Sequence, residues 1–343
     1  MNAGLTYPIE SFGATGTLVD VAPGIRGVRM PLPFALDHVN AWLLDDDDGG
    51  ITIVDTGAGT NDTMAAWDTL FARLPSTARV SRVIATHMHP DHVGLAEWLC
   101  KRWNAPLWMT AGEYGLARVS AARMTGTDVN TQVAHFVRHG IDAAQRDAVL
   151  ERGDHYARLV PDLPASYIRL RDGMSVRIGG RDWRVIVGYG HSPEHAALYC
   201  AQANVLISGD MLLPKISTNV SVWALEPHAD ALGDFLASIE RFRALPADVL
   251  VLPSHGLPFR GARTRVDQLV AHHDARLNEV FAACEAPRSA AQIVPLLFKR
   301  PLDAHQTTFA LGEALAHLHR LWFEGRLTRI DGDDGVLRFK QAA

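Results

Sequence analysis

The sequence has few cysteines, and no two of them stand close together. Cys100, Cys200 and Cys284 form no C-x-x-C pair, so neither a disulfide framework nor a thiolate metal site is indicated. The first residues contain no basic stretch followed by an apolar one, which argues against a signal peptide. No apolar run approaches the ~20 residues that a membrane span needs. We therefore expect a cytoplasmic protein that does not enter a membrane.

An excess of positive charge is also missing. The chain has 33 Lys and Arg against 38 Asp and Glu, which gives a formal net charge of -5. Proteins that bind nucleic acid usually carry a basic stripe, so this balance argues against such a partner. The remaining composition, 48% hydrophobic and 21% charged, is that of an ordinary globular protein. Its 343 residues are enough for one large or two modest domains.

Strand and helix patterns alternate through the first part of the chain. Residues 39–44 and 51–55 flank an acidic turn and predict a hairpin. Apolar residues at helical spacing predict a helix over 62–74, a buried strand follows over 80–86, and another helix is predicted over 93–104. This order is typical of an α/β fold whose chemistry lies at the carboxyl ends of strands.

Two later regions have a different character. Residues 113–160 predict two or three helices with an Arg-bearing surface, which would cover a sheet, shape substrate choice as a cap, or do both. Near the C-terminus, helices over 290–298 and 306–325 and a hairpin over 327–339 predict a winged-helix-like module. Its second helix is not basic, which favours an accessory or homodimer-forming module over DNA binding. We predict a catalytic domain over 1–262, containing the 113–160 insertion, and a C-terminal module over 263–343.

The densest group of potential metal ligands is the run Thr86-His87-Met88-His89-Pro90-Asp91-His92, directly after an apolar segment. Imidazole nitrogens and carboxylate oxygens are the usual zinc ligands. His87 and His89 alternate, so in an extended segment both point to one face. Pro90 then breaks the strand and re-aims Asp91 and His92 at the start of a helix. Ligands in two directions suit two adjacent metals better than one.

Three further strand ends each carry a His or Asp beside a glycine. They are Gly190-His191-Ser192, Ser208-Gly209-Asp210 and Ser254-His255-Gly256, and each follows an apolar strand. One such feature usually only satisfies loop hydrogen bonds. Four at strand ends that can share one sheet edge predict a composite site.

This ordered set of motifs resembles that of the metallo-β-lactamase superfamily, over residues ~18–260. Asp55, in Val54-Asp55-Thr56-Gly57, also matches an early D-x-G element of the superfamily. The resemblance implies a four-layered αββα sandwich with two divalent metal ions at one edge, Zn²⁺ first, with Mn²⁺ or Fe²⁺ as alternatives. It places one ion on His87, His89 and His191, and the other on Asp91, His92 and His255, with Asp210 bridging. The Asp at 210 and the His at 89 fit the glyoxalase II and lactonase branch, because a true β-lactamase typically has Cys at the first of these positions.

The resemblance also implies a mechanism. Two cations sharing a hydroxide would supply a nucleophile at neutral pH, and Asp91 could pass a proton to the leaving group, which makes Asp91 and Asp210 the expected catalytic residues. Asp55 is expected to fix the tautomer of a His ligand from behind, and His195 is interpreted as a core histidine. The candidate substrate-binding residues are Tyr189, Lys215 and Asn219.

Two substrate classes stay open. The first is a small-molecule acyl compound, namely a carboxylic ester, thioester or lactone, because the 113–160 insertion mixes apolar and Arg side chains. The second is the substrate of an endoribonuclease or phosphodiesterase of the same fold. Enzymes of that kind also carry a winged-helix-like extension, but the acidic balance of this chain argues against them. A non-enzymatic interaction module disagrees with seven intact ligand positions.

Overall fold

The computed structural model describes residues 4–34 and 36–343, which separate into two compact units, each built from three segments. The first unit comprises Met1–Ala122, Tyr156–Thr218 and Ile239–Val266. The second comprises Arg123–His155, Asn219–Ser238 and Asp267–Ala343. Each unit is therefore assembled from segments that are distant in the sequence. The division into a catalytic domain over 1–262 and a C-terminal module over 263–343 stays a prediction from the sequence pattern.

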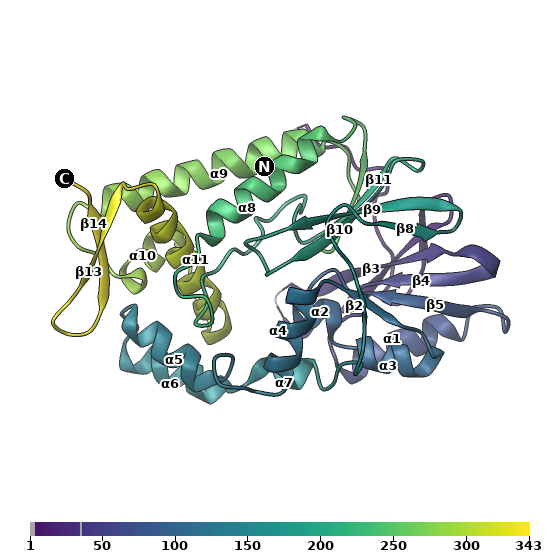
Figure 1. The fold of residues 1–343 in the computed structure, drawn as a ribbon, viewed down its shortest axis with the longest axis horizontal. Helices are drawn as coiled ribbons and strands as arrows, with labels where there is room; N and C mark the ends of the chain where they lie inside the picture. The colour runs from purple at the N-terminus through teal and green to yellow at the C-terminus, as the bar shows by residue number, and fades with distance from the viewer. Residues whose placement is uncertain (1–3, 35) are drawn as a thin grey trace. The chain divides into compact units, whose positions relative to one another are not determined.

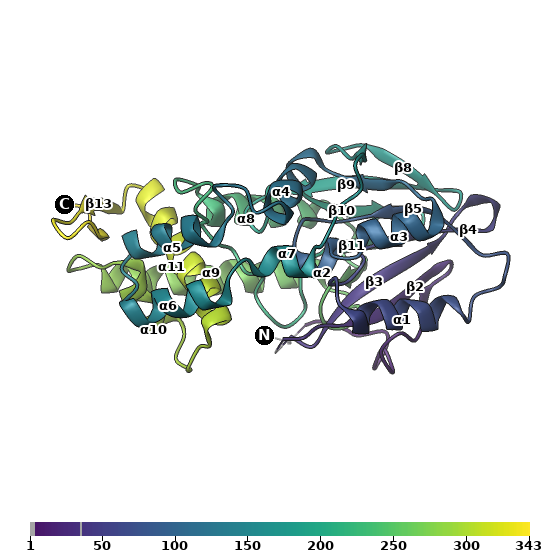
Figure 2. The ribbon, with the colours of Figure 1, turned by 90° about the horizontal axis from the view of Figure 1, so that it is seen from below.

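The first unit contains two sheets that face each other, as Figure 1 shows. One sheet has seven strands in chain order, antiparallel from β1 to β4 and parallel from β4 to β7. Its strands are β1 (Val19–Ala22), β2 (Ile25–Pro31), β3 (His38–Asp45), β4 (Gly50–Val54), β5 (Arg79–Ile84), β6 (Leu107–Met109) and β7 (Ile168–Arg169). Helices α1 (Asn61–Phe71) and α3 (Ala96–Trp103) pack on its outer face (Figure 2).

The second sheet has the order β12-β11-β10-β9-β8, with only β11 and β12 parallel. Its strands are β8 (Ser175–Ile178), β9 (Arg181–Gly188), β10 (His195–Cys200), β11 (Val205–Gly209) and β12 (Leu250–Pro253). Fully buried side chains from both sheets, such as Trp42, Ile84 and Leu198, form the core between them. The α/β sandwich expected from the sequence is confirmed, and burial of this core is its main source of stability.

The helix predicted over 93–104 is interrupted. The chain instead forms α2 (Pro90–Val93) and α3, with Gly94 and Leu95 between them. A Cβ at position 94 would lie 2.5 Å from the backbone nitrogen of Gly59 and 2.6 Å from the carbonyl oxygen of Leu159. Only glycine lets these three stretches of backbone approach so closely, and α2 is therefore held as a separate turn beside the strand end.

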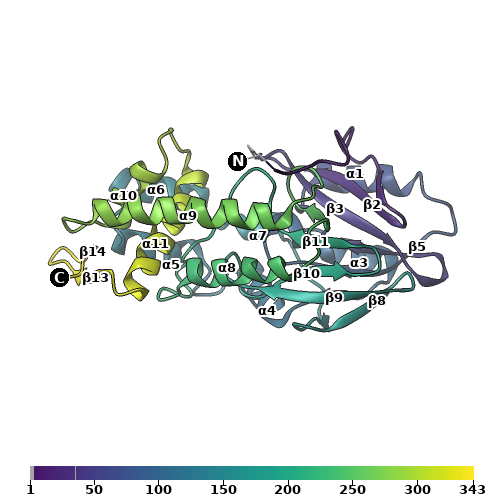
Figure 3. The same cartoon turned by 90° about the horizontal axis from the view of Figure 1, so that it is seen from above.

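The second unit combines the C-terminal segment with two internal ones. Helices α5 (Val129–Arg138) and α6 (Ala143–Arg152) lie beside α10 (Ala290–Leu297) and α11 (Ala304–Phe323), as Figures 2 and 3 show. Phe136, Ile141 and Leu311 form a buried cluster that joins them. The hairpin of β13 (Leu327–Asp331) and β14 (Leu337–Gln341) follows α11, so the predicted helix, helix and hairpin are all present.

Other helices complete the chain. The predicted 113–160 insertion contains α4 (Ala111–Ala121), α5, α6 and α7 (His155–Leu159). Two helices lie outside the predicted elements, α8 (Ala231–Glu240) and the 22-residue α9 (Ala262–Ala283). Among the described residues, no helix is both long and apolar enough to cross a membrane.

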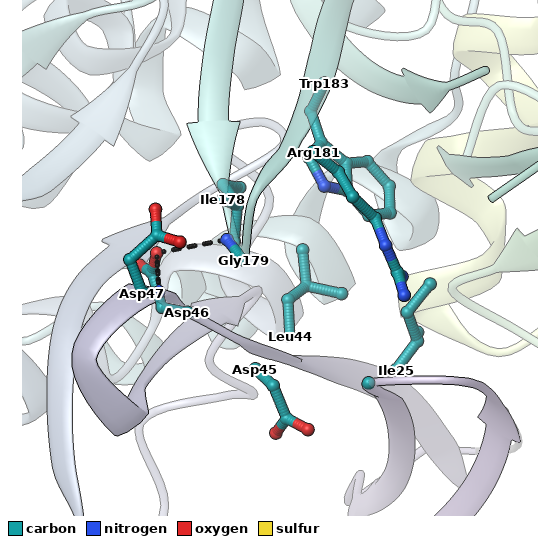
Figure 4. Close-up of a pocket in the computed structure, with 10 residues that line it drawn as sticks. Ile25, Leu44, Asp45, Asp46, Asp47, Ile178, Gly179, Arg181 and Trp183 are labelled. Atoms are coloured by element: carbon teal, nitrogen blue, oxygen red, sulfur yellow. Dashed lines mark hydrogen bonds between the residues drawn. The ribbon is translucent and has the colours of Figure 1, made fainter. Parts of the chain in front are cut away.

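A cavity of about 280 Å³ opens where the β3–β4 turn meets the β8–β9 turn (Figure 4). The buried Asp46 carboxylate accepts hydrogen bonds from the backbone nitrogens of Asp47 and Gly179 and from the Thr52 hydroxyl. These bonds link the two sheets at this end of the sandwich. The ligand-bearing strand ends lie at the other end of β3 and β9, so this cavity is separate from the predicted site.

Candidate metal centre

The fold brings all seven predicted ligand residues to one edge of the sandwich. His87 and His89 follow β5, Asp91 and His92 belong to α2, and His191, Asp210 and His255 follow β9, β11 and β12. Their ligand atoms form three overlapping groups, each within 4.8 Å. These groups are His87, His89 and His191; His87, His92 and Asp210; and Asp91, His92 and His255.

Asp210 lies between the two outer groups. Its Oδ2 is 3.5 Å from His191 Nε2 and 3.7 Å from His92 Nε2, and its Oδ1 is 3.4 Å from His255 Nε2. The Asp91 Oδ2 atom lies 3.4 Å from both His92 Nε2 and His255 Nε2. One carboxylate therefore reaches both groups, and the other reaches only the second.

The donor atoms fit divalent cations better than they fit one another. His87 Nε2 lies 3.0 Å from His89 Nδ1 and 3.2 Å from His191 Nε2, so three ring nitrogens converge on one small volume. His92 Nε2 and Asp210 Oδ1 are buried and have no hydrogen-bond partner among the described residues. Buried polar atoms of this kind are costly unless they bind something, and nitrogen and carboxylate donors suit zinc and similar ions.

The charges differ between the two outer groups. Burial lowers the pKa of His87 far below its usual value and that of His89 to about 3, so both are neutral imidazoles. Burial acts the same way on His92 and His255, but Asp91 and Asp210 outweigh it, raising the pKa of His92 strongly and that of His255 to about 10. The second group therefore needs positive charge, which either protons on the two histidines or divalent cations supply.

Asp55 orients His92 from behind. Its Oδ2 accepts a hydrogen bond from His92 Nδ1 at 2.8 Å, which leaves Nε2 as the donor atom that faces the cluster. The same carboxylate accepts bonds from the backbone nitrogen and hydroxyl of Thr86. Asp55 adopts a left-handed backbone with φ of 64°, a conformation that few residues other than glycine take. Asp55 thus lies behind the candidate ligand His92, and its role in fixing the tautomer of a metal ligand stays a prediction.

The remaining ligand loops are held by buried polar groups too. His195 is buried, as a core histidine would be, and its Nε2 accepts a bond from the backbone nitrogen of Asp210. The carbonyl of His38 accepts from His255 Nδ1 at 2.8 Å. The Asn40 side-chain amide donates to the carbonyls of Pro253 and Gly256 on either side of that loop. The loops that carry Asp210 and His255 are therefore held by hydrogen bonds within the fold.

Two supporting residues were missed by the sequence analysis. Glu113, at the start of α4, is a fully buried carboxylate that bonds to the loops carrying His87, His89 and His191. Arg265 is fully buried and donates to the carbonyls of Leu213 and Ile216, in the loop that follows Asp210. Neither residue stands in a motif, and only the burial of a charged side chain in the fold reveals it.

The candidate substrate-binding residues are not brought together in the same way. Tyr189 precedes the His191 loop and is 45% exposed, and Lys215 is exposed in the loop after Asp210. Asn219 belongs to the second unit, where it donates to Glu313 and accepts from the Ser221 hydroxyl. Their role in binding a substrate stays a prediction.

Comparison with known proteins agrees with this geometry. The sequence profile of the metallo-beta-lactamase superfamily matches residues 35–255, and that of the metallo-beta-lactamase-like C-terminal domain matches residues 277–342. A crystal structure of a beta-lactamase domain protein from Burkholderia ambifaria is 53% identical, covers 98% of both chains and superposes with a TM-score of 0.93.

Among curated proteins, a probable metallo-hydrolase of Bacillus subtilis, YqjP, is 23% identical over 89% of this chain and 94% of its own length. A hydroxyacylglutathione hydrolase of Roseobacter denitrificans is 29% identical over 40% of this chain and 50% of its own.

Proposed function

This chain belongs to the metallo-β-lactamase superfamily, and from that premise we propose that it is a binuclear metal-dependent hydrolase of carboxylic esters, thioesters or lactones. The observation that carries the proposal is the place of Asp210 between the two ligand groups, 3.5 Å from His191 Nε2 and 3.4 Å from His255 Nε2. In addition, His92 Nε2 and Asp210 Oδ1 are buried without a hydrogen-bond partner among the described residues. His87, His89 and His191 would hold one ion, and Asp91, His92 and His255 the other, most readily zinc. Bound there, two divalent ions would lower the pKa of water and polarise a substrate carbonyl.

The chain's own residues supply orientation and proton transfer. Asp55 and the His38 carbonyl keep His92 and His255 in the tautomer whose Nε2 faces the substrate side. The side chain of Asp91 is 19% exposed, against 10% for Asp210. Asp91 is therefore the carboxylate that a leaving group can reach. Its ionised Oδ2 would first accept the proton that the attacking water releases and would then pass it to that group.

Acyl chemistry is supported by two facts. A relative over part of the chain is a hydroxyacylglutathione hydrolase, and an acylglutathione is a thioester. The net charge of -5 disfavours a polyanionic substrate such as RNA. Homodimer formation through the C-terminal module stays a prediction.

The test combines metal analysis with a hydrolysis panel. Protein expressed with added zinc should contain about two ions per chain, and protein without any bound ion would refute the binuclear site. The panel consists of an aryl ester, an acyl-coenzyme A, an acyl-homoserine lactone, a phosphodiester and a short RNA. We expect cleavage among the first three, absent in an Asp210→Ala preparation. Cleavage of the last two alone would instead identify a phosphodiesterase of the same fold.

A further inference from the structure

Glu113 is a buried carboxylate whose hydrogen-bond partners lie in two ligand loops. Its Oε2 accepts from the backbone nitrogen of Met88 at 2.8 Å, and Met88 stands between His87 and His89. Its Oε1 accepts from the Ser192 hydroxyl and from the backbone nitrogen of Glu194, both at 2.6 Å. Each oxygen thus holds one loop.

The backbone of Met88 is held through its carbonyl as well. Its carbonyl accepts a hydrogen bond from the hydroxyl of Tyr156 at 2.7 Å. Glu113 therefore holds the peptide unit between His87 and Met88, and Tyr156 holds the next one, between Met88 and His89. Ser192 directly follows His191 in the sequence. The same carboxylate therefore also holds the backbone next to this third histidine.

We propose that Glu113 is a positioning residue that selectively sets the metal affinity of the His87, His89 and His191 group. This inference rests on the proposed function, because it presupposes that the group binds an ion. The selectivity follows from the contacts: Glu113 joins the two loops of this group, whereas Asp55 holds His92 and the His38 carbonyl holds His255.

Glutamine cannot replace this carboxylate. All three partners of Glu113 are donors, so both oxygens must accept. An amide has one oxygen and one NH₂ group, so in Glu113→Gln the NH₂ would face either the Met88 nitrogen or the Ser192 and Glu194 donors. A buried donor would lose its acceptor and one loop would shift. Mutating a residue that holds a metal ligand in place typically weakens metal binding about 10–100-fold.

The experiment is a titration of the metal-free full chain with Co²⁺. Binding is monitored by calorimetry and by the visible absorption of the bound ion. Wild type should bind two ions. Glu113→Gln should bind one ion about 10–100-fold more weakly and the other unchanged. Ser192→Ala and Tyr156→Phe, which remove one bond each, should weaken the same ion by less. Because His89→Ala already damages this group, adding Glu113→Gln to it should cause no further loss.

Asp46→Asn is the matched control. Like Glu113, Asp46 is a buried carboxylate that accepts from two backbone nitrogens and a hydroxyl, but it lies at the opposite end of the sandwich and also pairs with Arg82 at 3.0 Å. It should leave both affinities unchanged.

The outcomes separate the inference from the proposed function. If wild type binds no ion, the proposed function fails. If wild type binds two ions and both affinities are retained in Glu113→Gln, only the inference fails. Equal weakening of both ions would likewise overturn the selectivity. If Glu113→Gln does not fold, the Ser192→Ala and Tyr156→Phe titrations decide, since unchanged affinities in both would refute the role of Glu113.

Discussion

Both units of the molecule are rich in buried histidine, yet the three candidate metal-binding groups among the described residues all lie in the first. In the first unit, His92 and His255 face Asp91 and Asp210, and these carboxylates raise their pKa values. In the second, burial lowers the pKa of His135, His139 and His317 to about 4 in each case. His92 and His255 are thus charged partners of carboxylates in the first unit, whereas these three histidines are neutral core residues in the second.

The hydrogen bonds explain the contrast. His139, His317 and His319 in the second unit each donate a ring nitrogen to a backbone carbonyl, those of His135, Glu313 and Ala229. These imidazoles are therefore hydrogen-bonded core residues of the helical unit. Ring nitrogens in the first unit instead converge at strand ends, where loops bring carboxylates to them. Histidine content alone therefore does not indicate a metal site, and convergence of the ring nitrogens at strand ends is what makes the first unit a candidate.

The largest effect should come from Asp210, which lies between both ligand groups. Asp210→Ala should lower metal affinity and turnover by at least ~100-fold, more than the loss of a supporting residue causes. Metal content by elemental analysis and hydrolysis of the panel substrate measure this. Asp230→Ala in the second unit, which breaks an ion pair with Arg320, is the control and should keep its metal. Full metal content in Asp210→Ala would contradict the proposal that the first unit binds metal through its carboxylates.

Metal removal should matter more at high pH. The pKa of His255 is raised to about 10 in the metal-free fold, so its ion pairs stabilise fully below pH ~6.5 and are lost as pH rises through about 10. Bound metal would replace these protons and add about 4 kcal/mol at a thousandfold excess over Kd. Thermal unfolding with and without chelator should show a gap in Tm that widens from pH 6.5 to 9.5. A gap that narrows with pH would contradict this charge balance.

The smallest effect concerns a buried acid of the second unit. Burial raises the pKa of Glu313 to about 7, so folding loses stability as pH rises from ~4.5 to 7. Glu313→Gln should therefore raise the stability at pH 8, by about 1 kcal/mol, and leave metal content unchanged. Thermal unfolding at pH 5 and pH 8 tests this, because the gain should vanish at the lower pH. Asp91→Asn, the corresponding change in the first unit, should instead weaken metal binding.

The candidate ligand residues could be identified from the sequence because most of them stand in short motifs that are recognisable locally. Four of the seven stand in one hexapeptide, and the others follow apolar strands beside glycine. His87 and His89 lie in a turn and not in the extended segment first expected, but His87 Nε2 still faces His89 Nδ1 at 3.0 Å. Pro90 at the first position of α2 re-aims Asp91 and His92, as predicted.

The supporting residues could not be predicted in this way. Glu113 is one acid in the first turn of a helix, and its partners are 25 to 81 residues away in sequence. The division into units could not be predicted either, because it depends on contacts between segments that are distant in the sequence. Residues 113–160 do form helices, but helical periodicity does not say that α4 joins the first unit while α5 and α6 pack with α10 and α11.

The three-segment construction of the second unit has a consequence for synthesis on the ribosome. By residue 266 every strand and ligand of the first unit has been made, so that unit can close early. Phe136 and Ile141, made long before, cannot complete their buried cluster until Leu311 emerges. In the interval α5 and α6 would expose apolar surface. A chain truncated at residue 262 would therefore leave the apolar surface of α5 and α6 without the helix that covers it.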